Sequence, residues 1–190
     1  MLLAKNSVWK ISNSDLAADG YYRVIDVMQN VESVFLFYLD NESREVRPFA
    51  VSLGMFKEGY KAKQITEADY NLPPFLSIAE EYIPTEHIIR RDKNYRLITP
   101  LINDREFLFD YATKKRTTKL AKYALSADIN KRSLCRLLTN YWRYGQNISA
   151  CLPAFSNSGG IGKAKKSTDK PLGAPKQPRT IVTDHVKLIH

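Results

Sequence analysis

Several features that mark membrane, secreted and metal-binding proteins are missing from this sequence. Its only cysteines, Cys135 and Cys151, stand outside any CxxC-type spacing, which excludes a disulfide scaffold and a paired-cysteine zinc site. His87, His185 and His190 form no metal-ligand spacing either. No apolar run reaches the ~18 residues that a membrane-spanning helix needs, and the apolar start is too short for a signal peptide. We therefore expect a cytoplasmic protein with no membrane partner.

Acidic residues are almost missing from one part of the chain. Residues 114–180 hold 15 Lys+Arg but only Asp128 and Asp169, whereas residues 1–113 hold 13 Lys+Arg and 17 Asp+Glu. The whole chain has a formal net charge of +9. Because a solvated surface normally mixes both signs, the one-sided charge indicates a nucleic-acid partner for the C-terminal third.

The first third of the 190-residue chain favours β-structure. Runs rich in β-branched and aromatic residues, separated by turn-forming Asn and Asp, predict strands over 9–11, 22–28, 33–39 and 46–51. Gly59 is expected to stop a short helical turn that begins near residue 52. We predict an α+β fold with a small β-barrel-like domain over 1–65, built as a small barrel or a curled sheet, then a proline-containing connector over 66–86.

From residue 87 the apolar residues recur at helical spacing, which predicts a helical domain over 87–152. A short helix over 118–125 is expected to turn Leu120, Ala121, Ala124 and Leu125 inward. After a turn containing Ile129, Asn130 caps a second helix over 131–144, and Gly145 ends it. Two helices joined by a tight turn, the second one basic, predict a helix-turn-helix.

The second helix has one apolar and one polar face. Packing of Leu134, Leu137, Leu138 and Tyr141 on the first helix would turn Thr139 and the basic side chains outward. A major groove admits one such helix, and Arg and Asn suit bidentate hydrogen bonds to guanine and adenine. We predict double-stranded DNA as the partner, with these DNA-binding residues on the helix: Lys131, Arg132, Ser133, Arg136, Asn140 and Arg143.

Basic residues outside that helix extend the predicted DNA contact. Residues 153–180 are rich in Ser, Gly, Lys and Pro, and they read either as a flexible linker or as an extended arm in a minor groove. Residues 181–190 restart a helical pattern that we expect to continue in a longer protein. The additional predicted contacts are Lys114, Lys115, Arg116, Lys119, Lys163, Lys165, Lys166, Lys176 and Arg179.

Residues 137–160 resemble the TnsB transposases of heteromeric, TnsABC-type transposons, which are related to Mu transposase. The likeness lies in Tyr141-Trp142-Arg143-Tyr144-Gly145, Ala150-Cys151-Leu152-Pro153-Ala154-Phe155 and Asn157-Ser158-Gly159. More weakly, Val8-Trp9-Lys10-Ile11 and Tyr22-Arg23-Val24-Ile25 resemble the family's N-terminal β domain. Ser126-Ala127-Asp128 and Cys151 are departures from the family pattern, so they leave the details of the contact open.

The resemblance implies that the chain binds repeated sites in transposon ends, as the N-terminal part of a transposase. It also implies a parent enzyme that cleaves and joins DNA for integration with a DDE carboxylate triad and Mg²⁺, together with a TnsA-type nuclease and an AAA+ regulator. No carboxylate of this chain matches the triad. We therefore expect the chain itself to need no cofactor and to be catalytically inert.

Three readings compete with transposon-end binding. A helical hairpin with a solvated basic face would account for the helix pattern without DNA. A stand-alone helix-turn-helix transcriptional regulator would share the helices, although regulators seldom need a long basic linker. A nuclease would need a carboxylate cluster, and the sequence shows none.

Overall fold

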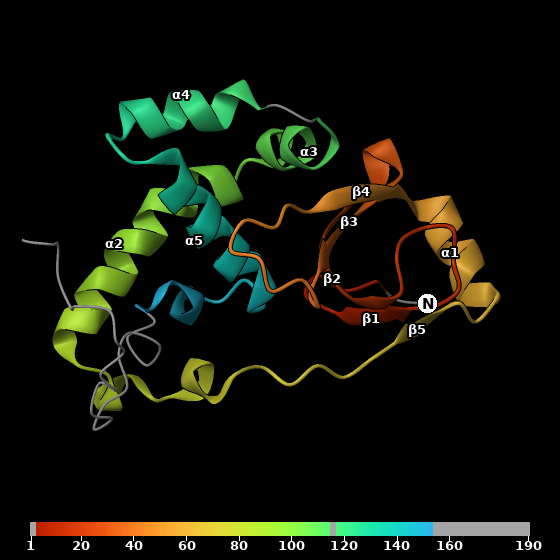
Figure 1. Ribbon diagram of the computed structural model, residues 1–190, viewed down its shortest axis with the longest axis horizontal. Coiled ribbons are helices and arrows are strands. Elements are labelled where there is room, and N and C mark those ends of the chain that lie inside the picture. The colour runs from red at the N-terminus through yellow and green to blue at the C-terminus, as the bar shows by residue number, and fades with distance from the viewer. Residues whose placement is uncertain (1–2, 115–116, 154–190) are drawn as a thin grey trace, which may run out of the picture. The chain divides into compact units, whose positions relative to one another are not determined.

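A computed structural model describes residues 3–114 and 117–153 of the chain (Figure 1). The α+β class predicted from the sequence is confirmed. In chain order the elements are β1 (Val8–Ile11), β2 (Gly20–Met28), η1 (Gln29–Val31), β3 (Ser33–Tyr38), β4 (Phe49–Ser52), α1 (Leu53–Lys61), β5 (Ile65–Glu67), η2 (Pro74–Ser77), η3 (Glu80–Tyr82), α2 (Thr85–Ile102), α3 (Arg105–Thr113), α4 (Thr118–Ser126), α5 (Lys131–Arg143) and η4 (Ile148–Cys151).

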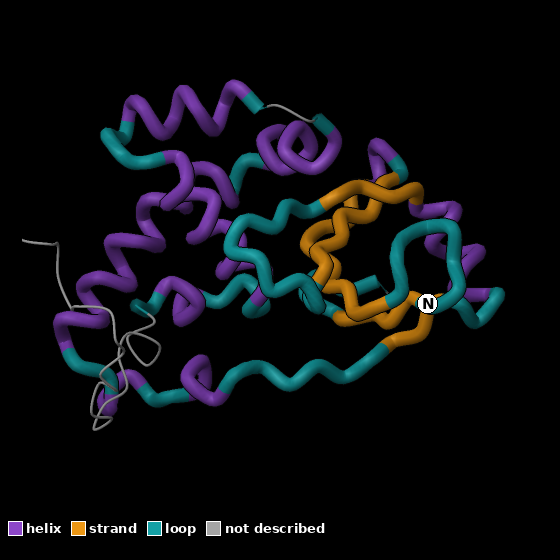
Figure 2. Tube along the Cα trace, in the orientation of Figure 1, coloured by secondary structure: helices purple, strands orange, loops and turns teal. Residues whose placement is uncertain are grey.

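The five strands form one antiparallel sheet in the order β4-β3-β2-β1-β5. The sheet is strongly curved (Figure 2). A register shift between Val24 and Asp26 on β2 marks a bulge, and bulges bend strands and increase their twist. Three of the four predicted strands are confirmed, and the strand predicted over 46–51 begins only at Phe49. The sequence pattern did not predict β5.

The expected closure into a barrel is wrong, because the two edge strands β4 and β5 do not pair. The short helix α1 connects these edges and contacts both of them. Phe56 of α1 is fully buried in a cluster with Trp9 and Ile65. Gly59 was expected to end this helix but lies inside α1. A Cβ at this position would come within 2.8 Å of the Ile65 side chain, so the close packing of α1 on β5 favours glycine.

The other hydrophobic cluster joins the sheet to the helices. It contains Phe35 and Phe37 of β3 together with Ile98, Phe107 and Trp142 from three helices. Residues 1–153 consequently form one compact unit. The domain boundaries predicted at residues 65 and 86 stay predictions, because a shared core does not show whether either segment folds alone.

Residues 68–84 connect β5 to α2 with only the two short 3-10 turns η2 and η3. Buried Arg91 of α2 holds the end of this connector by an ion pair between its Nη2 and Glu80 Oε1, 3.1 Å apart. Arg91 Nε also pairs with Asp92 Oδ1 at 2.8 Å. Within 3–114 and 117–153, no helix is long and apolar enough to cross a membrane.

Candidate nucleic-acid interface

The two helices α4 and α5 are joined by a tight turn over 127–130. Asp128 adopts a left-handed conformation, with φ of 48°, and the Ile129 amide donates to the Ala124 carbonyl at 3.0 Å. The Asn130 side chain then caps α5 by accepting from the Arg132 amide at 2.8 Å. Asn is among the best N-cap residues because its side-chain oxygen satisfies an otherwise unpaired helical N–H. The two predicted helices and the predicted cap are confirmed.

The buried part of α5 is wider than the sequence pattern indicated. Leu134, Leu138 and Tyr141 are buried as expected. Thr139 was expected to face outward but is only 1% exposed, and Trp142 is buried as well. The reason is that α5 packs against the sheet as well as against the helices; the Trp142 ring lies 6.4 Å from Phe37 of β3.

The exposed face of α5 is concentrated in its N-terminal half. Lys131, Arg132 and Arg136 are exposed, and Ser133 and Asn140 are partly exposed. Positions 132, 136 and 140 follow one another at intervals of four residues, so they share one side of the helix. Four of the predicted DNA-binding residues, Arg132, Ser133, Arg136 and Asn140, therefore lie on one continuous polar surface.

Arg143 has a different environment from these residues. Its Nη2 atom donates to the main-chain carbonyls of Asn41 and Ser43, at 2.8 and 2.6 Å, and its Nε is buried without a partner among the described residues. Both carbonyls belong to residues 39–48, the loop between β3 and β4. The predicted DNA contact of Arg143 stays a prediction, but in this structure the side chain holds that loop.

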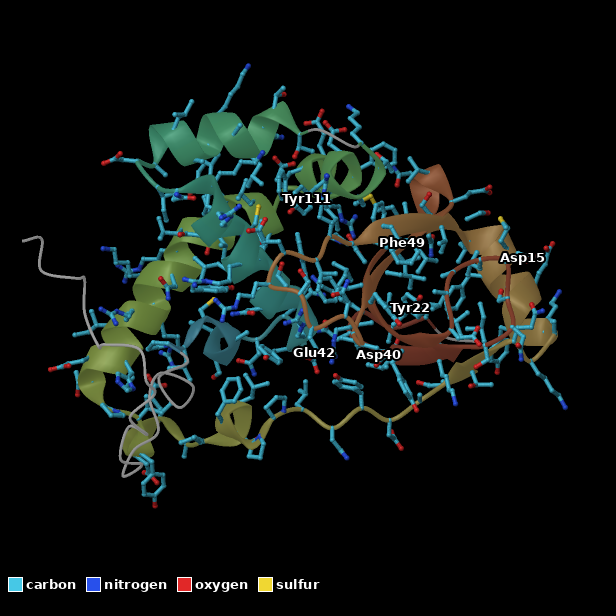
Figure 3. The ribbon with its side chains drawn as sticks, in the orientation of Figure 1. Asp15, Tyr22, Asp40, Glu42, Phe49 and Tyr111 are labelled. Carbon is cyan, nitrogen blue, oxygen red and sulfur yellow. The ribbon has the colours of Figure 1, made fainter. Side chains whose placement is uncertain are left out.

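The β3–β4 loop lies along α5 and is fixed to it at further points. The Thr139 hydroxyl donates to the Val46 carbonyl at 3.0 Å and accepts from the Val46 amide at 3.2 Å. Arg132 Nε pairs with Glu45 Oε1 at 3.0 Å. Figure 3 labels Asp40 and Glu42 at the start of this loop, so the segment that is fixed to α5 carries further acidic residues.

The far end of the loop is fixed by Arg47. Its Nη2 donates to the carbonyls of Tyr111 and Lys114, the latter at 2.9 Å. Its guanidinium carbon lies 4.2 Å from the centre of the Tyr111 ring, which is labelled in Figure 3. Burial raises the pKa of the Tyr111 phenol, so the ring stays neutral beneath this cation.

Two predicted DNA contacts near α3 and α4, Lys114 and Lys119, are paired with acids of α3 and its N-cap. Lys114 pairs with Asp110 at 2.8 Å, and Lys119 pairs with Asp104 and with Glu106. The hydrogen bond between Asp104 and Lys119 raises the pKa of the lysine and lowers the pKa of the carboxyl. These predicted contacts lie outside the described residues: Lys115, Arg116, Lys163, Lys165, Lys166, Lys176 and Arg179.

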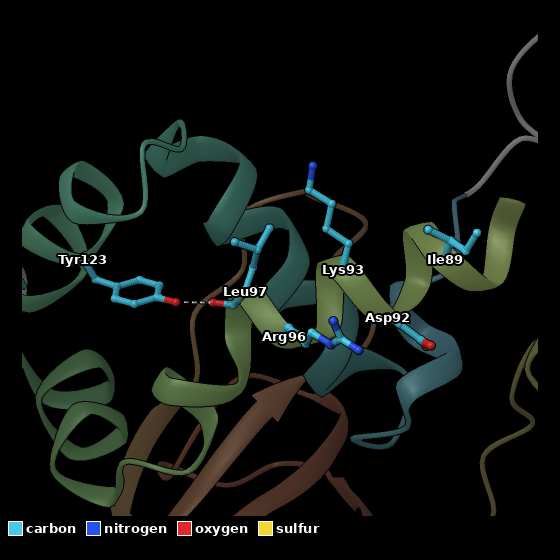
Figure 4. Close-up of a pocket in the computed structure, with 6 residues that line it drawn as sticks. All are labelled: Ile89, Asp92, Lys93, Arg96, Leu97 and Tyr123. Carbon is cyan, nitrogen blue, oxygen red and sulfur yellow. Dashed lines mark hydrogen bonds between the residues drawn. The ribbon is translucent and has the colours of Figure 1, made fainter.

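A hollow of about 490 Å³ opens on α2 beside α4 (Figure 4). The Tyr123 hydroxyl donates to the Leu97 carbonyl at 2.8 Å and so ties the two helices together at this hollow. The hollow is lined by both apolar and charged side chains, and the sequence analysis did not predict it. The lining residues are Ile89, Asp92, Lys93, Arg96, Leu97 and Tyr123.

The described residues contain little that could act in covalent or metal-assisted chemistry. Burial raises the pKa of the Cys151 thiol to about 12, so this sulfur stays protonated and unreactive at neutral pH. Within 3–114 and 117–153, no group of three or more His, Cys, Asp or Glu side chains is placed to hold a metal ion. Among the described residues, the exposed polar face of α5 is therefore the strongest candidate for a functional site.

Comparison with known proteins finds similarity to transposition proteins. Residues 91–155, which include α3, α4 and α5 and most of α2, match the family model described as the TnsB second domain. The transposition protein TnsB of transposon Tn7 from Escherichia coli is 24% identical to this chain over 161 residues. That alignment covers 85% of this chain and 22% of the Tn7 protein, so the chain spans about a fifth of its relative. The resemblance to the N-terminal region of a TnsB-type transposase is thereby confirmed.

Proposed function

We propose that this chain, as the N-terminal region of a TnsB-type transposase, binds double-stranded DNA sequence-specifically at transposon ends. The observation that carries the proposal is the polar surface of α5 formed by Arg132, Ser133, Arg136 and Asn140. It begins at the N-terminal end of the helix, where the positive end of the helix dipole favours phosphate. Its Arg and Asn side chains are those that read guanine and adenine in a major groove.

The charge around this surface suits a polyanionic partner. Residues 117–153 contain six Lys+Arg and a single acid, Asp128. Lys131 is exposed on the first turn of α5, within reach of a phosphate beside an inserted helix. In the proposed complex α4 and α5 act as a helix-turn-helix, with α5 in the major groove and the basic segment over 153–180 along the backbone or minor groove.

The activity of the parent protein is part of the proposal. DNA cleavage and strand transfer with Mg²⁺ belong to a catalytic domain outside this chain, and so do contacts with a TnsA-type nuclease and an AAA+ regulator. We place the protein on DNA in the bacterial cytoplasm. The chain itself serves to select and position the DNA.

A footprint of the full chain on the ends of its own transposon, beside a scrambled duplex of equal composition, tests the proposal. We expect protection of short repeated sites, with major-groove contacts centred on α5. Equal affinity for both duplexes at moderate salt would contradict sequence-specific binding. Protection of a promoter without repeats would favour a transcriptional regulator.

Variants on two helices separate specific contact from general charge. Arg136→Ala should weaken binding to the end duplex by ~1–3 kcal/mol and relax the preference at one base pair. Lys57 is an exposed lysine on α1, so Lys57→Ala is the matched loss of one positive charge away from α5. It should leave both duplexes unaffected, and an equal loss in the two variants would show that only net charge matters.

The basic tail gives a third measurement. Neutralising Lys163, Lys165 and Lys166 together should weaken binding to every duplex alike. It should also flatten the salt dependence by roughly one unit of slope for each lost phosphate contact. A loss confined to one sequence would instead show that this segment reads bases.

A further inference from the structure

The ion pair between Arg132 and Glu45 joins two parts of the chain that lie far apart in the sequence. Arg132 stands on the first turn of α5, and Glu45 stands on the β3–β4 loop. The bond uses the Nε atom of the arginine, 3.0 Å from Oε1 of the glutamate. Both side chains remain open to solvent, at 85% exposure for Arg132 and 45% for Glu45.

The backbone beneath Glu45 is held firmly. Its neighbour Val46 is buried, and both polar main-chain groups of Val46 bond to the Thr139 hydroxyl of α5. On the other side of Glu45, Arg143 of the same helix binds the carbonyl of Ser43. The loop is thus tied to α5 both before and after the glutamate, so the carboxylate has a defined place beside the helix.

Because Arg132 binds Glu45 through Nε, the ion pair does not use the edge of the guanidinium that carries the two terminal nitrogens. An arginine reads guanine by two parallel hydrogen bonds to O6 and N7, and the two terminal nitrogens can supply both. Neither terminal nitrogen of Arg132 has a partner within the part of the chain that the structure describes. The carboxylate therefore orients the side chain without occupying the groups that would meet a base.

Stability does not explain this pair. Exposed ion pairs contribute little to folding, because the charges are screened by water and the side chains lose conformational freedom. A carboxylate next to a DNA-facing helix also repels phosphate, which lowers affinity for every duplex. An ion pair that adds little stability and lowers the affinity for DNA in general needs another role, and orienting the Arg132 side chain is such a role.

We propose that Glu45 is a positioning residue for DNA recognition, which fixes the Arg132 guanidinium so that its terminal edge reads a guanine. The inference rests on the proposed function of α5 as the recognition helix. It adds that the β3–β4 loop, and hence the sheet, takes part in base selection. An exposed arginine samples many rotamers, so fixing one of them lowers the entropy lost on binding.

The test compares Glu45→Gln with Glu42→Gln in the full chain. Glu42 is exposed on the same loop, so its variant removes one negative charge close by without touching Arg132. Base preferences are measured for each protein with a library of randomised duplexes, and affinities with the selected duplex and single-base variants of it. Melting temperatures equal to that of the wild type verify folding.

We expect Glu45→Gln to lose about two- to fivefold discrimination at one base pair, the most that an exposed ion pair can contribute to orienting Arg132. The same base pair should lose its preference in Arg132→Ala, and the double variant should lose no more than Arg132→Ala alone. Glu42→Gln should keep the full base preference of the wild type.

Two results would overturn the inference while leaving the proposed function intact. One is an equal gain in affinity for all duplexes in both Gln variants, which would make Glu45 a competitor of DNA. The other is additive losses in the double variant. A wild-type chain that selects no duplex from the library would overturn the proposed function and the inference together.

Discussion

Replacing Thr139 by valine removes a buried hydroxyl that forms two hydrogen bonds between α5 and the β3–β4 loop. The change keeps the shape of the side chain but leaves the amide and carbonyl of buried Val46 unpaired. Each buried polar group that loses its partner costs ~1–3 kcal/mol. We therefore expect Thr139→Val to lower the free energy of unfolding by about 2–4 kcal/mol, although valine is the more apolar residue.

Thermal unfolding and hydrogen exchange measure this effect. In a protein of about this size each kcal/mol changes the melting temperature by ~2–4 °C, so the expected loss is roughly 4–16 °C. Thr139→Ser is the control, because it keeps the hydroxyl and should cost only ~1 kcal/mol for the lost methyl group. The Val46 amide should exchange faster in the valine variant alone. A valine variant as stable as the wild type would refute the view that the loop is anchored here.

Three further predictions concern charge and burial. The pKa of Asp104 is lowered, first by its hydrogen bond to Lys119, so its contribution to stability is present above the unfolded carboxyl pKa near 3.8 and is lost as the pH falls through the lower folded value. Melting temperatures should accordingly fall less steeply below pH 4 in Asp104→Asn than in the wild type. Arg23 is 4% exposed, and among the described residues its Nε and Nη2 have no hydrogen-bond partner, whereas Nη1 donates to the Asn6 carbonyl. Because burial lowers its pKa, Arg23→Met should melt at or above the wild-type temperature; a large drop would show that the contacts with Asn6 and the Tyr70 ring outweigh the cost of burying the charge. In chemical denaturation Leu120→Ala should cost ~2–5 kcal/mol, whereas Leu125→Ala should change stability by less than about 0.5 kcal/mol; equal losses would contradict the orientation of α4.

Much of the local structure could be predicted because it depends on neighbours in the chain. The strands containing Trp9, Tyr22 and Phe35 have the β-branched and aromatic composition of a half-buried sheet. The start of α5 follows from Asn130, whose side chain caps the helix in the structure as expected. These signals act over a few residues, so one sequence is enough to show them.

The predictions that failed depend on contacts between segments that lie far apart in the sequence. Thr139 looked like a surface residue because its partner Val46 lies 93 residues away, beyond any periodic pattern. Leu125 looked like a core residue at the end of α4, but it is 82% exposed because α5 does not extend over that position. The sheet stays open since α1 occupies the place where β4 and β5 would pair, and no local signal distinguishes this outcome from a barrel.

The contact between the β3–β4 loop and α5 changes how the charge of residues 114–180 is understood. By sequence alone, the acidic residues of 1–113 and the basic residues of 114–180 appear to be separate, and the helix appears as a uniform cationic surface. In the structure the loop brings Glu45 to Arg132 and a pair of backbone carbonyls to Arg143. Arg143 is thus already engaged, whereas Arg132 is paired only through Nε. Under the proposed function, we expect binding to arbitrary DNA to be weakened more than binding to a site whose bases match Arg136, Asn140 and the oriented Arg132. Under the proposed function, the acidic loop therefore increases selectivity at the expense of general affinity, which is the balance that a protein needs to find transposon ends among a large excess of other DNA.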